Sequence, residues 1–461
     1  MTEIAATPEP ASGATVRERV RDLALAVLKG DDERALTIRR AAVAFCIRLL
    51  SAALLYVTQV VLARWVGAAD FGVYVFVWTA VLLMGGLSHL GLAVAMIRLL
   101  PEYAERRADA LMRGLVRGGR LFAVANATLV STVAALLVWV WPGVLAEPYV
   151  VPLLIAFLCV PMVTLSEVHD GIGRSQGWMI AGLLPPYVMR PLFVLGGIVV
   201  MEAAGIAPSA EAAVWAAVIA TWAAAIVQLA LIEQRLPALV ATGARDHDVR
   251  RWAVVALPLF VIGGCEVFLQ TTDVLILSAF AAPDDVGIYF AAAKTMALIM
   301  FVHYAVGSAA ARQFARHAAN EDRAALLRTV RDAVRFTFWP SLFGAIVIVA
   351  LGPFLLSLFG PDFARGYPVM FVLVAGFLAR AAMGPSEFLL NMAGEQRACA
   401  VVFAIAAVTN VVAALVLIPA LGMLGAAVAT AIAVTLVGCL NGVIAARRLG
   451  IRLPIWYHVG R

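Results

Sequence analysis

LARWVGAADFGVY, at residues 62–74, joins two long apolar runs, and LSAFAAPDDVGIY, at 277–289, does the same 215 residues later. In register the two stretches share four residue pairs: Leu62 and Leu277, Asp70 and Asp285, Gly72 and Gly287, Tyr74 and Tyr289. A membrane chain built from two similar halves is a common plan for secondary transporters, with the substrate site between the halves. The repeat therefore predicts a two-lobed carrier and directs the question to its cargo.

The composition agrees with a membrane protein. Of the 461 residues 63% are hydrophobic and only 14% are charged, and the mean hydropathy is +0.94. No soluble domain buries that much apolar surface. The net charge of +6 is small and the basic residues form no nucleic-acid face, so we expect no nucleic-acid partner. The five cysteines lie in or beside apolar runs and indicate neither a disulfide framework nor a zinc site.

A helix that crosses a bilayer needs roughly 20 apolar residues. Twelve runs reach this length, at 41–63, 72–97, 119–141, 149–169, 179–201, 211–232, 252–280, 286–311, 336–358, 366–390, 397–418 and 423–446. None has the period of two that membrane β-strands show. The sequence therefore predicts an all-α polytopic membrane protein with twelve transmembrane helices.

These helices are expected to form two six-helix bundles related by the internal repeat. The predicted segments are a cytoplasmic N-terminal segment with an amphipathic helix (1–40), the first bundle (41–232), a cytoplasmic linker (233–251), the second bundle (252–446) and a cytoplasmic tail (447–461).

Lysine and arginine set the orientation of such a chain. With the N-terminus inside, the inside segments carry 29 of the 35 Lys and Arg residues and the outside loops carry two. This bias predicts that both termini are cytoplasmic. Three inside segments, 16–27, 106–120 and 323–335, alternate apolar residues with arginines and are expected to lie as helices on the membrane surface. Ordinary basic segments that only fix topology are the alternative.

Four stretches in order resemble one known family. They are ARWVGAADFGVY at 63–74, PDDVGIYFAAAK at 283–294, FGPDFARGYPVM at 359–370 and LIPALGMLGAAVATAIA at 417–433. Over roughly residues 40–450 the chain is similar to bacterial polysaccharide biosynthesis transporters. These are Wzx-type flippases of the multidrug/oligosaccharidyl-lipid/polysaccharide exporter superfamily.

The resemblance implies a multi-pass protein of the bacterial inner membrane and not an enzyme. It would turn undecaprenyl-diphosphate-linked oligosaccharide from the cytoplasmic to the periplasmic leaflet for lipopolysaccharide or exopolysaccharide synthesis. The implied partners are the lipid-linked oligosaccharide, membrane lipids and polysaccharide assembly proteins. No cofactor is implied, and H⁺ or Na⁺ are the candidate coupling ions.

Charged residues inside the apolar runs are candidates for the site, because an ionisable group in a bilayer is costly unless it serves a cavity or a partner. A diphosphate requires cations, and arginine holds phosphate in a bidentate manner. The expected cargo-binding residues are Arg48, Lys294, Arg380, Arg190 and Gln59. The expected coupling or cavity acids are Glu266, Asp273 and Glu387. Internal ion pairs among these residues are the alternative.

Three further polar positions have a structural interpretation. Glu167 and Asp170 with Arg174 are expected to form a salt bridge at the inner end of the fourth span. His303 is expected to be a packed core residue. It lies nine residues after Lys294 and on the opposite helix face, so both can line one cavity only if the helix breaks.

Two other functions remain as alternatives. A cation-coupled drug antiporter of the same superfamily would use Glu266 and Asp273 as its ion site. A membrane polysaccharide polymerase or ligase generally needs a large outside loop, whereas the expected outside loops have about ten residues or fewer. The chain has no GxxxxGK[ST] stretch for a nucleotide and no cluster with metal-ligand spacing.

Overall fold

The computed structural model describes residues 33–141, 143, 145–236, 243–320 and 322–457, and every regular element in these residues is a helix. In this part of the chain eleven helical segments are long and apolar enough to cross a membrane. The first, Cys46–Glu105, overlaps two of the predicted runs, and each other segment overlaps one. The predicted all-α polytopic class is therefore confirmed. The amphipathic helix predicted at 16–27 lies outside the described residues.

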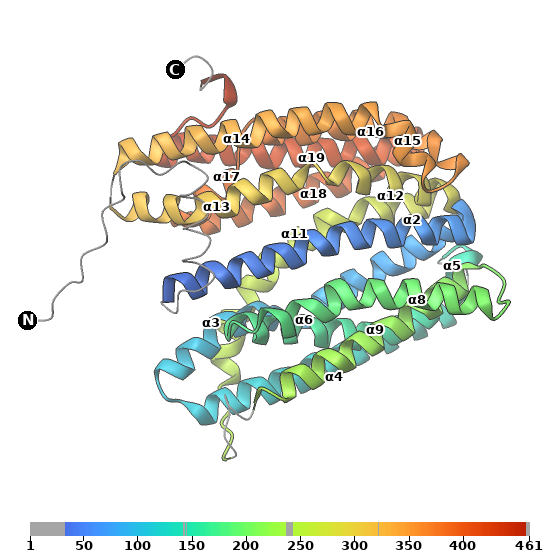
Figure 1. Cartoon of the computed structure of the whole chain (residues 1–461), viewed down its shortest axis with the longest axis horizontal. Helices are drawn as coiled ribbons and strands as arrows, with labels where there is room; N and C mark the ends of the chain where they lie inside the picture. Colours follow the sequence, from blue (N-terminus) through green and yellow to red (C-terminus); the bar gives the residue numbers. More distant parts are fainter. Residues whose placement is uncertain (1–32, 142, 144, 237–242, 321, 458–461) are drawn as a thin grey trace, which may run out of the picture.

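The first half of the chain forms a group of helices that we call the first bundle (cyan and green in Figure 1). Its elements are α2 (Glu33–Ser88), α3 (Leu92–Glu105), α4 (Asp109–Val140), α5 (Glu147–Ala156), η1 (Phe157–Cys159), α6 (Val160–Ser175), α7 (Met179–Leu184), η2 (Pro185–Met189), α8 (Arg190–Ala203) and α9 (Ala210–Glu233).

The second half forms the second bundle (yellow to red in Figure 1). Its elements are α11 (Val249–Phe280), α12 (Pro283–Ala297), α13 (Met300–Ala319), α14 (Arg323–Ala350), α15 (Gly352–Ser357), η3 (Pro361–Gly366), α16 (Tyr367–Ala381), α17 (Ser386–Met392), α18 (Gln396–Leu421), α19 (Met423–Ile444), η4 (Ala445–Leu449) and η5 (Ile455–Tyr457). Helix α2 lies between the two groups, against α12 and α11 of the second bundle.

Several helices are interrupted where the sequence has helix breakers. In α2 the chain turns at Gly67, whose φ of 82° is accessible to glycine but strained for other residues. At η2 the proline-rich sequence PPYVM becomes π-helical, because prolines cannot donate the regular backbone hydrogen bonds. A turn at Leu298 and Ile299 separates α12 from α13, and a turn containing Pro385 separates α16 from α17.

The two similar stretches of sequence lie against each other where the bundles meet. A Cβ atom on Gly72 would stand 1.6 Å from the carbonyl oxygen of Pro283, and one on Gly287 would stand 2.8 Å from that of Ala68. The backbones of α2 and α12 thus approach as closely as small residues allow. The Tyr56 hydroxyl lies 3.2 Å from the Thr295 hydroxyl across the same junction. Both glycines of the repeat are therefore contact residues.

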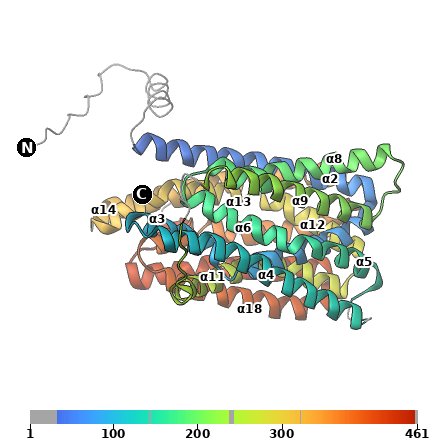
Figure 2. The ribbon, with the colours of Figure 1, turned by 90° about the horizontal axis from the view of Figure 1, so that it is seen from below.

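The start of α2 and the C-terminal segment lie at the same end of the molecule in Figures 1 and 2. We call this the terminal end and the opposite one the far end. At the far end, Arg64 of α2 donates hydrogen bonds to the carbonyl oxygens of Leu358 (2.5 Å) and Ser357 (3.0 Å). These bonds join the two bundles beyond the contact of α2 with α12.

The expected linker 233–251 packs on the first bundle in its described part. The Asp246 amide donates to the Ala110 carbonyl at 3.0 Å, and Arg113 donates to the Ala244 carbonyl at 2.8 Å. Arg251 then pairs with Glu102 of α3. The beginning of α11 is therefore held by α3 and α4.

The prediction of separate surface helices at 106–120 and 323–335 was wrong. Residues from Asp109 onward belong to α4 and residues from Arg323 onward belong to α14, each without a break before its span. The apolar stripe of the first segment, including Leu115, packs with Leu99 and Leu100 of α3. That of the second, including Val334, packs with Phe314 and Leu390. The apolar stripes of both segments therefore pack against other helices of the protein and not against lipid.

Candidate functional site

Arg48 and Arg190 face aromatic rings in the first bundle. The Arg48 guanidinium lies 4.4 Å from the centre of the Tyr187 ring, and that of Arg190 lies 5.1 Å from the Trp78 ring. The Trp78 ring is in turn stacked on Tyr74. Tyr187 is placed by the π-helical turn of η2, which the prolines around it create. The rings hold the guanidinium groups by cation–π attraction while leaving their hydrogen-bond donors available.

Helix α6 brings two carboxylates to these arginines. Glu167, Asp170 and Arg174 are spaced by three and four residues and so share one helix face. Asp170 forms the expected ion pair with Arg174, at 2.8 Å. Glu167 interacts electrostatically with Arg48 and Arg190 as well as with Arg174. The pair expected to be only a structural salt bridge thus belongs to a larger cluster.

The second bundle holds a triad. Arg380 Nη2 lies 2.9 Å from Glu387 Oε1, and His303 Nε2 lies 2.6 Å from the same oxygen. All three side chains are buried. The turn before α17 brings Arg380 and Glu387 together, and His303 of α13 reaches the same carboxylate from a neighbouring helix. This geometry favours the internal ion pair over free cargo-binding and coupling groups at these positions.

Asp273 and Lys294 occupy a second polar region of this bundle. The buried Asp273 accepts hydrogen bonds from the hydroxyls of Tyr289 (2.6 Å) and Thr430 (3.4 Å). The side chain of Lys294 is exposed, lies 5.0 Å from the Phe290 ring centre and interacts electrostatically with Asp273. Lys294 is therefore accessible, and Asp273 is the nearby carboxylate that interacts with its charge.

The two remaining predicted residues, Glu266 and Gln59, belong to none of the groups described above. Glu266 of α11 accepts a hydrogen bond from the Tyr304 hydroxyl at 3.3 Å. Gln59 of α2 is 5% exposed, whereas Arg48 of the same helix is exposed. The Gln59 side-chain oxygen has no hydrogen-bond partner among the described residues.

Sequence reasoning missed several participants. Tyr187, Trp78 and Tyr304 contact the predicted charges, but aromatic residues in apolar runs give no signal that separates them from core. The proximity of Tyr187 to Arg190 and the prolines was the one available hint. His169 was also missed: it is fully buried on α6, and neither ring nitrogen has a hydrogen-bond partner in the described part of the chain.

The bundles differ in their balance of charge. The first cluster holds three cations (Arg48, Arg174 and Arg190) and two carboxylates (Glu167 and Asp170). The polar groups of the second bundle comprise two cations (Lys294 and Arg380), three carboxylates (Glu266, Asp273 and Glu387) and His303. The first cluster thus has one more cation than carboxylates and the second group has one fewer, so cations are in excess in the first bundle alone and the two groups balance together.

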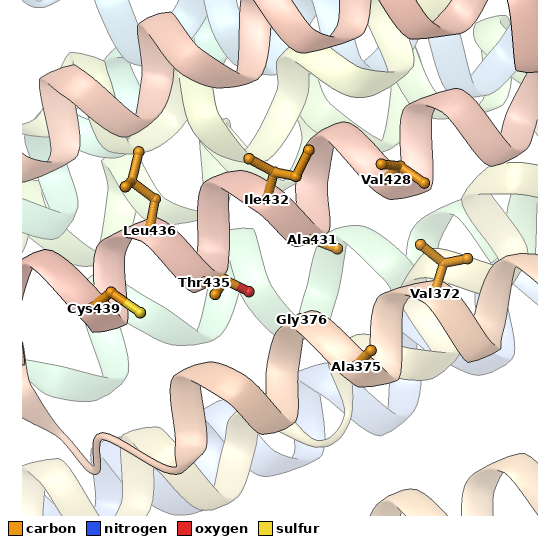
Figure 3. Close-up of a pocket in the computed structure, with 9 residues that line it drawn as sticks. All are labelled: Val372, Ala375, Gly376, Val428, Ala431, Ile432, Thr435, Leu436 and Cys439. Carbon is orange, nitrogen blue, oxygen red and sulfur yellow. The ribbon is translucent and has the colours of Figure 1, made fainter. Parts of the chain in front are cut away.

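A groove between α16 and α19 lies apart from these charges (Figure 3). Its walls are apolar except for Thr435 and Cys439. It contains none of the predicted residues and no group that would bind a diphosphate. In the described residues, no group of three or more His, Cys, Asp or Glu is placed to hold a metal ion.

Comparison with known proteins gives one family and a shared fold. The family described as polysaccharide biosynthesis protein matches residues 38–311, which is more than half of the chain. A multidrug resistance MATE family transporter of the MOP superfamily, in an inward-facing conformation, superposes with a TM-score of 0.71 at 11% identity. The match covers 87% of this chain and 94% of that one.

Two further solved structures are similar. The lipid II flippase MurJ, in an inward closed conformation, gives a TM-score of 0.69 at 12% identity over 88% of this chain and 86% of that one. A MOP superfamily transporter from Pyrococcus furiosus gives 0.63 at 12% identity over 92% and 98%. At these identities the likeness shows the fold. None of the curated protein sequences matches this chain.

Proposed function

The chain belongs to the polysaccharide biosynthesis protein family, and from this premise we propose that it flips a lipid-linked oligosaccharide across the membrane. The cargo would be an undecaprenyl-diphosphate-linked oligosaccharide that moves from the cytoplasmic to the periplasmic leaflet. The product would serve lipopolysaccharide or exopolysaccharide synthesis. The protein would reside in the bacterial inner membrane with both termini inside, among membrane lipids and polysaccharide assembly proteins.

One observation carries the proposal: Arg48 and Lys294 are accessible cations on α2 and α12, the two helices that join the bundles. In the described residues neither forms an ion pair. Cations without a close carboxylate can bind a diphosphate, and guanidinium groups do so in bidentate geometry. Arg190 and Gln59 would support the same site.

Transport would occur by rocking of one bundle against the other. The first bundle would comprise residues 41–232, the second residues 252–446, and the linker residues 233–251. The contacts at Gly72 and Gly287 and the Arg64 hydrogen bonds would close the far end in one state and open in the other. No step in this cycle requires catalysis of a covalent reaction.

The test is a deletion in the host, followed by analysis of lipid-linked oligosaccharide in each leaflet. We expect accumulation in the cytoplasmic leaflet, loss of a surface polysaccharide, rescue by the intact gene and no rescue by Arg48→Ala or Lys294→Ala at equal protein level. Wild-type polysaccharide output from both variants would refute the proposal.

A cation-coupled drug antiporter is the second candidate, and the excess of carboxylates in the second bundle favours it. Glu266 and Asp273 would then serve H⁺ or Na⁺ coupling. In the same deletion strain, unchanged lipid-linked intermediates with heightened sensitivity to cationic dyes would support the antiporter and exclude the flippase.

A further inference from the structure

The acidic face of α6 and the arginines of α2 and α8 form one cluster. Asp170 is buried and pairs with Arg174, whereas Glu167, one turn earlier, is half-buried. Arg48 interacts electrostatically with both carboxylates, and Arg190 interacts with Glu167. The Arg48 guanidinium lies over the ring of Tyr187, 4.4 Å from its centre. Among the described residues Asp170 and Arg174 are the ion pair of this cluster, and Arg48 and Arg190 lie within electrostatic range of its carboxylates.

A carrier of an anion must neutralise its own cations whenever the cargo is absent, and a cluster of this composition can do so. Guanidinium groups in a membrane are costly unless anions accompany them. When the cargo is present, its diphosphate supplies the negative charge. When the cargo has left, another anion must take its place if the empty protein is to change conformation.

Glu167 and Asp170 have the chemistry for that task. A carboxylate presents two acceptor oxygens and one negative charge to guanidinium donors, and the oxygens of a diphosphate present the same pattern. The two anions therefore compete for the same donors. Arg48, held on the Tyr187 ring with no carboxylate in ion-pair contact among the described residues, is the member of the cluster most available to an incoming diphosphate.

We propose that Glu167 and Asp170 are internal counter-anions, which neutralise Arg48, Arg190 and Arg174 in the empty carrier and yield them to the diphosphate of the cargo. This inference rests on the proposed flippase function and assigns a role to two carboxylates that the transport proposal did not use. The competition lowers the affinity for cargo. It also promotes release, because the carboxylates recapture the arginines as the diphosphate leaves.

Binding of geranylgeranyl diphosphate to the purified full-length protein tests the competition. We expect Glu167→Gln to bind this probe about tenfold more tightly than the wild type, because the negative charge that attracts Arg48 and Arg190 is removed; tenfold corresponds to about 1.4 kcal/mol. Asp170→Asn should act in the same direction. Glu167→Asp, which keeps the charge but shortens its reach, should lie between the wild type and Glu167→Gln.

Two controls isolate the cause. Glu395→Gln removes a carboxylate that pairs with Arg448 in the second bundle and should leave binding unchanged. Geranylgeraniol, which lacks the diphosphate, should bind equally to all variants. Adding Arg48→Ala to Glu167→Gln should abolish the gain in affinity, because the arginine released by the first change is absent.

A transport assay in vesicles supplies a second readout. Glu167→Gln should lower both KM and the turnover number, because tighter binding slows release. A merely structural role for Glu167 would lower turnover without lowering KM.

The outcomes separate the two proposals. If the wild type binds the diphosphate probe and neither Glu167→Gln nor Asp170→Asn binds it more tightly, the counter-anion role is overturned and the flippase proposal stands. If neither the wild type nor any variant binds the probe in preference to geranylgeraniol, both proposals fail together.

Discussion

At the scale of single residues, the same kind of side chain has different roles according to what lies beside it. Arg48 rests on an aromatic ring and is accessible, whereas Arg380 is buried and paired with Glu387. Sequence analysis treated both as candidates for cargo binding, because an arginine in an apolar run looks the same in either setting. The partner of Arg380 lies beyond a turn, and only the folded chain brings the two together.

The buried triad predicts a large loss of stability when one member is removed. Glu387→Ala leaves Arg380 and His303 buried without their anion, and such a change costs about 3–5 kcal/mol in free energy of unfolding. Thermal unfolding of the purified protein measures the effect, with Glu395→Gln as the matched control on an exposed arginine pair. Equal unfolding temperatures for the two variants would contradict the assignment of a structural ion pair.

At the scale of helices, spacing and turns together determine which residues meet. The regular helical spacing of nine residues places Lys294 and His303 on opposite faces. Leu298 and Ile299 keep helical φ and ψ, so the two residues stay on separate faces: His303 meets Glu387 of α17, and Lys294 stays beside Asp273. The turn that contains Pro385, by contrast, brings Glu387 back toward Arg380.

The contact of α2 with α12 predicts a specific intolerance at Gly72. A methyl group in Gly72→Ala would overlap the carbonyl oxygen of Pro283, and backbone atoms cannot move aside as a flexible side chain can. We expect a lower unfolding temperature and loss of transport. Gly344→Ala in α14, where nothing lies within 4 Å of the added methyl group, is the control. It should gain up to about 1 kcal/mol from helix propensity. Wild-type stability and transport in Gly72→Ala would show that the bundles need not approach so closely.

At the scale of the whole molecule, polar contacts among the described residues join the two bundles at several points. Arg251 of α11 pairs with Glu102 of α3. Arg64 reaches two carbonyl oxygens of the second bundle at the far end, and Tyr56 meets Thr295 nearer the middle of α2. In an alternating-access cycle such contacts define one closed state, so their loss shifts the population of states without altering either bundle.

Arg64→Ala should therefore favour opening of the far end. Each hydrogen bond to a charged group is modest at an exposed position, so we expect roughly a threefold to tenfold increase in far-end accessibility. Labelling of a cysteine placed at the half-buried Val60, in a protein whose exposed Cys46 and Cys439 are replaced by serine, measures the accessibility with a membrane-impermeant thiol reagent. Arg365→Ala removes ion pairs to Asp284 and Asp285 within the second bundle and should leave the labelling rate unchanged. Equal labelling rates in the wild type and Arg64→Ala would show that the Arg64 hydrogen bonds do not stabilise the closed far end.

The sequence by itself determined the class of the protein, the positions of its twelve apolar runs and its family. These are local properties: the thickness of a bilayer fixes the length of each run, and short motifs at fixed intervals identify relatives. Only the tertiary structure decided which charges meet. Glu167 lies within electrostatic range of Arg48 and Arg190, and Glu387 pairs with both Arg380 and His303. These groups meet because helices distant in sequence pack together and because the turn that contains Pro385 brings Glu387 back toward Arg380. No periodicity along one helix contains that information, since it depends on contacts between helices.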